Sequence, residues 1–166
     1  MNHVRAHVLV CAGTGCTASG SKQVEAALRD ELVKKGLDKE VKVVETGCHG
    51  FCEMGPVVIV YPEGVFYCRV QPSDVPEIVE SHLYKGRIVE RLLYREPLTH
   101  QQIPNYNEIN FYKKQQRLVL ANCGHINPES IEEYIGTGGY EALGKALTQM
   151  TPEEVIAEIK ASGLRG

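Results

Sequence analysis

The chain has 166 residues, of which 43% are hydrophobic and 23% are charged, as is ordinary for a globular protein. This composition excludes a disordered chain, a collagen-like fibre and a coiled coil. No apolar run reaches the length of a transmembrane helix, and the N-terminus lacks the apolar region of a signal peptide. We therefore expect no membrane insertion and a cytoplasmic location. The net charge of −3 and the lack of a Lys/Arg cluster argue against a nucleic-acid partner.

Short apolar runs in the first half of the chain predict strands at residues 4–10, 41–45, 57–61 and 65–70. Two segments, residues 21–35 and 72–86, instead repeat their apolar side chains at helical spacing. Ser21 is the expected N-cap of the first helix, and Gly36 stands where a left-handed C-terminal residue is required. The order of these elements predicts an α/β domain over residues 1–86, with a mixed sheet and flanking helices.

Residues 87–110 contain two prolines, several polar residues and little periodicity, so they are expected to form a linker. Residues 111–166 predict a small and mostly helical unit. Its expected elements are a strand at Arg117–Leu120, a helix capped by Asn127 with Pro128 at its first position, a break at Gly136–Gly139, a helix bearing Leu143 and Met150, and a helix opened by the Thr151–Glu154 capping box and ended by Gly163. About 55 residues of this kind bury little apolar surface alone, so we expect the unit to begin a larger domain.

The six cysteines include two close pairs. Cys11 and Cys16 enclose four residues, Cys48 and Cys52 enclose three, and each pair follows an expected strand in a glycine-rich loop. If the two strands are neighbours in one sheet, four thiolates converge at one edge. In a reducing compartment, clustered thiolates more often bind metal or perform redox chemistry than form structural disulfides.

The spacing leaves three possibilities open: a [2Fe–2S] cluster, a zinc site, or two redox-active dithiol pairs. Structural zinc sites favour two-residue separations, although separations of up to four occur, and a thioredoxin-type active site requires C-x-x-C. A [2Fe–2S] cluster has a wider footprint with two cysteines at each iron, which suits the longer pairs. Phe51 and Met54 are expected to shield such a site from water. Glycines that permit close approach and amide donation to sulfur favour the cluster further: Gly13, Gly15, Gly20, Gly47, Gly50 and Gly55.

The cysteine pattern within this order of strands and helices resembles the thioredoxin-like [2Fe–2S] ferredoxins. The resemblance implies that Cys11, Cys16, Cys48 and Cys52 are the metal and cluster ligands. Blocks in the second half resemble the start of the NADH-binding flavoprotein subunit of complex I, of NAD(P)-linked and electron-bifurcating iron hydrogenases, and of formate dehydrogenases. These blocks are Arg117–Gly124, Pro128–Tyr134, Gly138–Leu143 and Met150–Val155. In the hydrogenase-type relatives the ferredoxin domain precedes the flavoprotein domain, as it does in this chain.

The resemblance implies an electron-transfer module of an NADH dehydrogenase or hydrogenase complex, in which one cluster passes single electrons between flavin and other iron–sulfur centres. In the family, residues 162–166 continue into a glycine-rich loop that binds FMN and NADH, and later cysteines bind a [4Fe–4S] cluster. We expect those sites only in the C-terminal part that this sequence lacks, and no NADH oxidation by this polypeptide alone. Other subunits of such a complex are the expected partners, and related ferredoxins allow a homodimer. A zinc-bound assembly domain and a thiol–disulfide protein are the alternative functions.

The remaining chemistry-bearing residues have simpler interpretations. Cys68 is expected to be a buried, inert thiol, since free cysteine packs as a small hydrophobe. Cys123 lies near His125 but has no paired cysteine nearby, so a local packing or turn role is expected. His49 is expected to be exposed, the alternative being a hydrogen bond near the cluster that tunes it. It is not expected to be a ligand, since a Rieske-type site needs two histidines. Residues 136–139 lack the Lys-Ser/Thr of a phosphate loop and are interpreted as a helix break.

Overall fold

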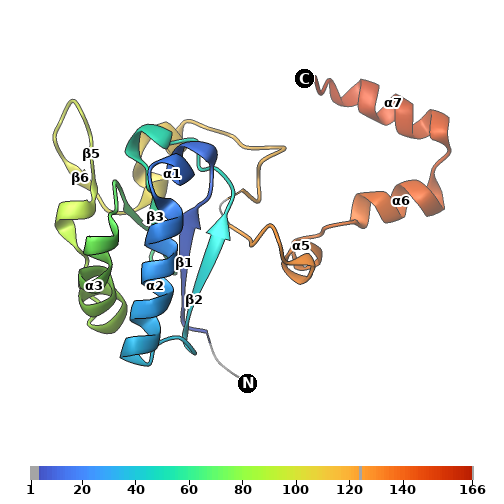
Figure 1. Cartoon of the computed structure of the whole chain (residues 1–166). Coiled ribbons are helices and arrows are strands. Elements are labelled where there is room, and N and C mark those ends of the chain that lie inside the picture. The colour runs from blue at the N-terminus through green and yellow to red at the C-terminus, as the bar shows by residue number, and fades with distance from the viewer. Residues whose placement is uncertain (1–3, 124, 166) are drawn as a thin grey trace. The chain divides into compact units, whose positions relative to one another are not determined.

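The computed structural model describes residues 4–123 and 125–165, and the chain divides into two compact units, Met1–Pro128 and Glu129–Gly166 (Figure 1). The first unit contains the main sheet and all six cysteines, and the described part of the second contains three helices. None of the helices in the described residues is long and apolar enough to cross a membrane.

A four-stranded mixed sheet is the centre of the first unit, with the strand order β2-β1-β3-β4. Its strands are β1 (Ala6–Cys11), β2 (Val41–Thr46), β3 (Val58–Tyr61) and β4 (Val65–Tyr67). β1 pairs parallel with β2, which places Cys11 opposite Thr46, and antiparallel with β3. β3 and β4 form the antiparallel hairpin. The mixed sheet predicted from the sequence is thereby confirmed.

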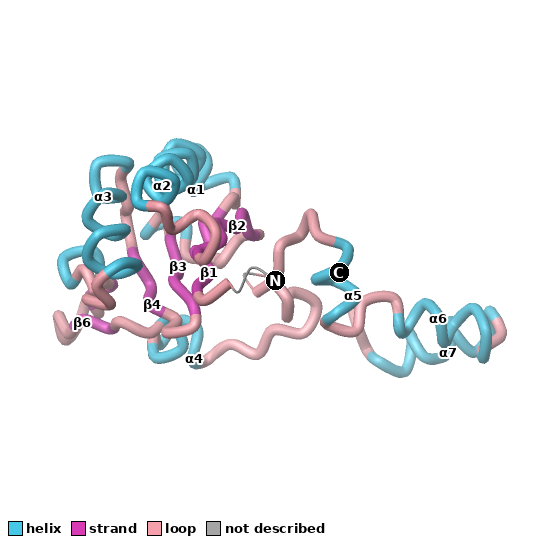
Figure 2. Tube along the Cα trace, turned by 90° about the horizontal axis from the view of Figure 1, so that it is seen from below, coloured by secondary structure: helices cyan, strands magenta, loops and turns pink. Residues whose placement is uncertain are grey.

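Two helices cover one face of this sheet (Figure 2). They are α2 (Ser21–Lys35), and the helix made of α3 (Val75–Glu77) and the π-helical segment Ile78–Tyr84. Leu28 and Leu32 of α2 are buried against Val8 and Val10 of β1. Gly36 ends α2 with a positive φ of 69°, as expected, because glycine adopts this conformation without a Cβ clash. The N-cap of α2 is Gly20 and not Ser21, which lies buried inside the first turn.

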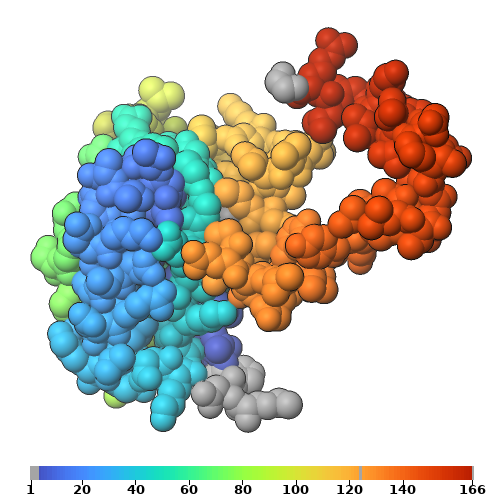
Figure 3. Space-filling view, turned by 45° about the vertical axis from the view of Figure 1, so that its right-hand side comes forward, coloured from blue at the N-terminus to red at the C-terminus, as the bar shows by residue number. Residues whose placement is uncertain are grey.

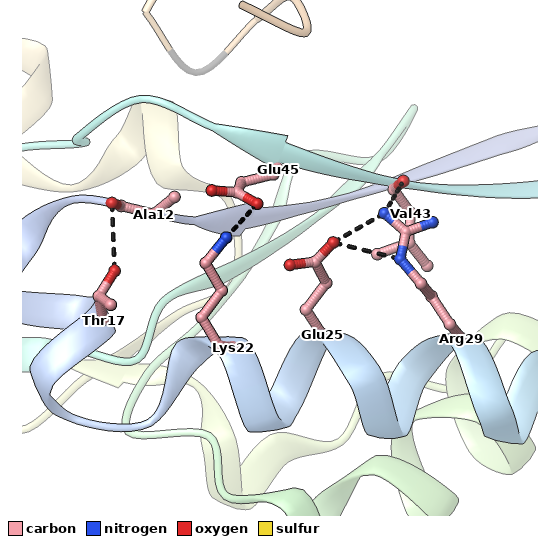
Figure 4. A network of polar contacts seen from close by, with 7 residues as sticks. All are labelled: Ala12, Thr17, Lys22, Glu25, Arg29, Val43 and Glu45. Atoms are coloured by element: carbon pink, nitrogen blue, oxygen red, sulfur yellow. Dashed lines mark hydrogen bonds and ion pairs between the residues drawn. The ribbon is translucent and has the colours of Figure 1, made fainter. Parts of the chain in front are cut away.

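Polar side chains hold α2 along β2, the edge strand beside it (Figure 4). Arg29 pairs with Glu25 one turn earlier at 2.7 Å and donates to the carbonyl oxygen of Val43 at 3.2 Å. Lys22 pairs with Glu45 of the same strand. These contacts occupy part of the exposed edge of the sheet, where unpaired carbonyl groups otherwise invite another strand.

Residues 87–110 are not a free linker, contrary to the sequence-based expectation. They contain β5 (Tyr94–Arg95), β6 (Gln102–Ile103) and the start of α4 (Asn110–Lys113). Phe66 N donates to Pro104 O and Cys68 N to Leu92 O, both at 2.8 Å, so this segment pairs with the outer edge of β4. Tyr94, Ile109 and Tyr112 are buried with Leu9 and Ile59 on the second face of the sheet. The sheet requires this cover because both of its faces carry apolar side chains.

The second unit consists of α5 (Ile131–Gly136), α6 (Glu141–Gln149) and α7 (Pro152–Ser162). The expected capping box is present, since Thr151 Oγ1 accepts from Glu154 N at 3.3 Å and Glu154 accepts from Thr151 N at 2.8 Å. No side chain among residues 129–165 is buried. These helices therefore owe their order to local signals, and their apolar side chains remain available to other surfaces.

Two local predictions for the second half are wrong. Arg117–Leu120 forms a bend and turn instead of a strand, and its apolar side chains Leu118 and Val119 are 75% and 77% exposed. The outer edge of β4 is already paired with Leu92 and Pro104, so this segment does not pair there. The helix expected to begin at Asn127 begins at Ile131, with Ser130 as its N-cap, because the Ser130 hydroxyl accepts from Glu133 N at 3.2 Å.

Candidate functional site

The two cysteine pairs lie on neighbouring loops. Cys11 ends β1, and Cys16 lies in the short helix α1 (Thr14–Ala18). Cys48 follows β2, and Cys52 begins a 3₁₀ turn, Cys52–Met54. Because β1 and β2 are parallel neighbours, their carboxyl ends meet at one edge of the sheet, as the sequence analysis predicts.

Three glycines allow the two loops to approach each other closely. A Cβ added at Gly13 would lie 2.9 Å from Cys48 Cβ and 3.0 Å from its Sγ. A Cβ at Gly15 would lie 3.0 Å from Cys52 Cβ, and one at Gly55 would lie 2.8 Å from Cys16 Sγ. Real Cβ atoms do not approach so closely, so these positions have to be glycine for the thiols to occupy their places. All three glycines belong to the set that the sequence analysis names.

The four thiols form an inner and an outer pair. Cys11 and Cys16 are buried, whereas Cys48 and Cys52 are exposed, with their sulfur atoms 3.8 Å apart. Burial, together with the neighbouring Cys11 and Cys52, raises the pKa of Cys16 to about 12. Cys16 is therefore a neutral thiol at pH 7 unless a metal cation displaces its proton.

The donor set fits a binuclear cluster better than a single ion. Among residues 4–123 and 125–165, no three His, Cys, Asp or Glu side chains are grouped as one metal ion requires. A [2Fe–2S] cluster of the ferredoxin type requires only two cysteines at each iron. Two thiol pairs on adjacent loops, brought together by glycines, meet that requirement.

An aromatic layer lies beside the exposed pair. The Phe51 ring stacks on Phe111 with centroids 4.9 Å apart and planes at 4°, and it also contacts Phe66, Tyr94 and Tyr112. Met54 is half-buried and packs on the same apolar cluster. This arrangement agrees with the shielding role expected for both residues, since apolar surroundings exclude water from sulfur ligands.

His49 is buried, and its expected exposure is wrong. Its side chain is 3% exposed, and Nε2 has no hydrogen-bond partner among the described residues. Burial, and secondly the positive charge of Arg117, lower the pKa of His49 to about 4, so the ring is neutral at pH 7. Nothing in the loop sequence itself indicates burial, because the covering residues come from a distant part of the chain.

The covering segment is residues 112–123, which lie against the second cysteine loop, residues 46–52 (Figure 3). Arg117 donates to His49 O at 2.9 Å and to Cys123 O at 3.3 Å, and its guanidinium lies 5.4 Å from the centre of the Tyr112 ring. Cys123 Sγ donates to Cys48 O at 3.1 Å. Cys123 thus makes a long-range contact in addition to its place in a local turn. No pattern in the sequence indicates that Arg117 lies at this site.

Cys68 lies directly after β4 and is 8% exposed. Burial raises the pKa of its thiol to about 12, so it is a neutral thiol at pH 7. These properties agree with the inert role that the sequence analysis gives it.

The part of the chain that holds the four cysteines is similar to known proteins. Residues 2–83 match the family described as thioredoxin-like [2Fe-2S] ferredoxin. A 2Fe-2S ferredoxin of Clostridium pasteurianum is 43% identical over 96 residues, which covers 52% of this chain and 92% of that protein. The crystal structure of the thioredoxin-like [2Fe-2S] ferredoxin from Aquifex aeolicus superimposes with a TM-score of 0.52 at 39% identity, covering 56% of this chain and 99% of that one.

A further similarity concerns a longer protein. The NADP-reducing hydrogenase subunit HndC of Solidesulfovibrio fructosivorans is 59% identical over 54 residues, which are 32% of this chain and 11% of that subunit. The match to this chain covers 92% of the Clostridium ferredoxin and 99% of the Aquifex ferredoxin, at 43% and 39% sequence identity. Identities at this level indicate more than a shared fold. The chain therefore belongs to the thioredoxin-like [2Fe–2S] ferredoxin family.

Proposed function

We propose that Cys11, Cys16, Cys48 and Cys52 hold one [2Fe–2S] cluster, and that the chain passes single electrons between a flavin centre and another iron–sulfur centre. The observation that carries the proposal is the meeting of both cysteine pairs at the carboxyl ends of β1 and β2. When bound, the cluster supplies the one-electron redox chemistry, and the chain supplies thiolates, hydrogen bonds and partial burial.

The chain's own residues divide this work between them. Gly13, Gly15 and Gly55 bring the two loops to the separation that four sulfur ligands need. Phe51 excludes water from one side of the outer pair. The exposure of Cys48 and Cys52 supports an approach of electron donors and acceptors at their face, because electron transfer requires a short path from the surface.

The proposed setting is a hydrogenase or NADH dehydrogenase complex, with other subunits of that complex as partners. The similarity to HndC, an NADP-reducing hydrogenase subunit, supports it. We propose residues 1–86 as the ferredoxin domain and residues 111–166 as the N-terminal portion of a flavoprotein-subunit domain, although residues 111–128 pack within the first structural unit. FMN, NADH and a [4Fe–4S] cluster belong, in this proposal, to the remainder of such a flavoprotein.

The second unit supports this setting with its unburied apolar side chains. A flavoprotein domain that continues from these helices would cover them. The exposed apolar residues of this unit are Ile131, Tyr134, Ile135, Tyr140, Leu143, Leu147, Ile156, Ile159 and Leu164.

The test is a visible absorption and EPR spectrum of anaerobically purified protein, with assays for iron, sulfide and zinc. We expect two irons and two sulfides per chain and a rhombic signal after one-electron reduction. Replacing Cys11 or Cys16 by Ser should remove or alter the signal, whereas Cys68→Ala should leave it unchanged. Protein with one zinc and no sulfide, or protein that stays free of iron after reconstitution, would overturn the proposal.

A further inference from the structure

The second cysteine loop is held by two hydrogen bonds from a segment beyond the family match. The match ends at residue 83, whereas Arg117 and Cys123 lie in the covering segment. Arg117 Nη2 donates to His49 O at 2.9 Å, and Cys123 Sγ donates to Cys48 O at 3.1 Å. A Cβ at Gly47 would lie 2.8 Å from Cys123 Sγ, so the loop and the segment are in direct contact there.

The carbonyl oxygen that accepts from Arg117 belongs to the same peptide unit as an N–H that donates to Cys48 Sγ. His49 O and Gly50 N are the two polar ends of the His49–Gly50 peptide, and Gly50 N donates to Cys48 Sγ at 3.2 Å. Because a peptide unit is planar, fixing its carbonyl oxygen also fixes the direction of its N–H. A cation bonded to the oxygen polarises the unit and strengthens the hydrogen bond at the opposite end.

Arg117 is itself held in place. It is half-buried, it donates also to Cys123 O at 3.3 Å, and it lies over the Tyr112 ring. A planar guanidinium holds its donors in a rigid fork and stacks its face on an aromatic ring, whereas a lysine ammonium is a flexible point charge. The geometry therefore specifies arginine at this position.

We propose that Arg117 is a positioning residue that tunes the cluster through the His49–Gly50 peptide. This inference rests on the proposed function, in which Cys48 is a ligand. Hydrogen bonds to ligand sulfur stabilise the more negative, reduced cluster, so Arg117 raises its reduction potential. The same contacts connect the segment that follows residue 110 to the electron carrier.

The test compares R117Q, R117K and R87Q in the full chain by EPR-monitored redox titration, with iron and sulfide assays. Arg87 is the matched control, because it lies far from the cysteine loops. It follows the helix whose Leu83 O accepts from Arg5, and Arg5 precedes β1, at the end of the sheet opposite to Cys11. We expect R117Q to keep its iron and sulfide but to shift its midpoint to a more negative potential. R117K should shift less, and R87Q should match the wild type.

A second readout uses the cluster-free chain. Without Arg117 the loop is less restrained, so iodoacetamide should alkylate Cys48 several-fold faster in R117Q than in R87Q, as measured by peptide mass spectrometry. If R117Q does not load a cluster, the midpoint of R117K decides the question.

The outcomes separate the two proposals. A wild-type chain without iron and sulfide overturns the proposed function, whatever the variants do. The role of Arg117 alone is overturned if the cluster-loaded R117Q variant has the wild-type midpoint and the wild-type alkylation rate. If R117Q does not load a cluster, the same result for R117K overturns it.

Discussion

The two structural units reach order by different physical means. In Met1–Pro128, apolar side chains cover both faces of the sheet, and residues from 6 to 112 share two buried clusters. In the described part of Glu129–Gly166, Ser130 caps α5 and Thr151 caps α7, but none of the three helices buries a side chain. Caps and helical spacing therefore define where helices begin and end, whereas a core requires surfaces that are distant in sequence.

The largest expected difference between the units is their response to losing a leucine. Leu28→Ala removes a fully buried side chain of α2 and should lower the free energy of unfolding by about 2–5 kcal/mol. Leu147→Ala in α6 removes a side chain that is 76% exposed and should change the free energy of unfolding by no more than about 0.5 kcal/mol. Urea denaturation followed by circular dichroism measures both. Equal losses would show that α6 is buried by a contact within this chain.

Adding one methyl group to a glycine should act in opposite directions in the two units. At Gly55 the new Cβ would meet Cys16 Sγ at 2.8 Å and Cys52 O at 3.2 Å, so Gly55→Ala should destabilise by about 1–3 kcal/mol and lower the bound iron. At Gly144, inside α6, nothing lies within 4 Å, and Gly144→Ala should favour the helix by up to about 1 kcal/mol. Thermal melts and iron assays check this pair, and unchanged iron in the Gly55 variant would contradict it.

Loss of a cap should remain local to the second unit. Thr151→Ala removes the acceptor for Glu154 N and should destabilise α7 by about 0.5–2 kcal/mol. Far-UV circular dichroism should show less helix, while the unfolding midpoint of the first unit stays the same. A shift of that midpoint would mean that the two units are energetically coupled.

The smallest expected effect is a pH dependence confined to the first unit. Burial lowers the pKa of His82, whose Nδ1 lies 2.9 Å from the Tyr67 hydroxyl. The unfolded chain, with an ordinary histidine pKa of about 6.5, therefore binds the proton more readily than the folded chain. Stability should be complete above that pH and should fall as the pH drops through and below it. His82→Gln should reduce this dependence in urea titrations between pH 7 and 5. The part due to His49, whose pKa burial lowers to about 4, should remain. A wild-type curve without slope would contradict the assignment.

Short-range patterns account for much that the sequence predicts correctly. The C-terminal glycine of α2, the capping box of α7 and the hairpin of β3 and β4 each depend on a few adjacent residues. The two cysteine pairs were also predictable, because parallel strands with a helix between them bring their carboxyl ends to one edge.

The errors share one physical cause. The expected linker at residues 87–110 has little periodicity, yet Tyr94 and Ile109 are buried because one face of the sheet remained to be covered. The expected strand at Arg117–Leu120 has strand-like composition but forms a bend and turn, and the edge of β4 is already paired with Leu92 and Pro104. His49 is buried, and its carbonyl oxygen accepts a hydrogen bond from Arg117, 68 residues away. In each case the deciding contact is long-range.

The sequence by itself determined the α/β class and the two close cysteine pairs that follow neighbouring strands, because those depend on residue types at close spacing and on helical or strand periodicity. Its motifs also carried the resemblance to the family. Only the tertiary structure decided which cysteines are buried, which segment covers the second loop and which peptide Arg117 restrains. Those properties depend on packing between segments that are far apart in the chain. Neither segment has a periodic sequence pattern that indicates which distant segment it contacts.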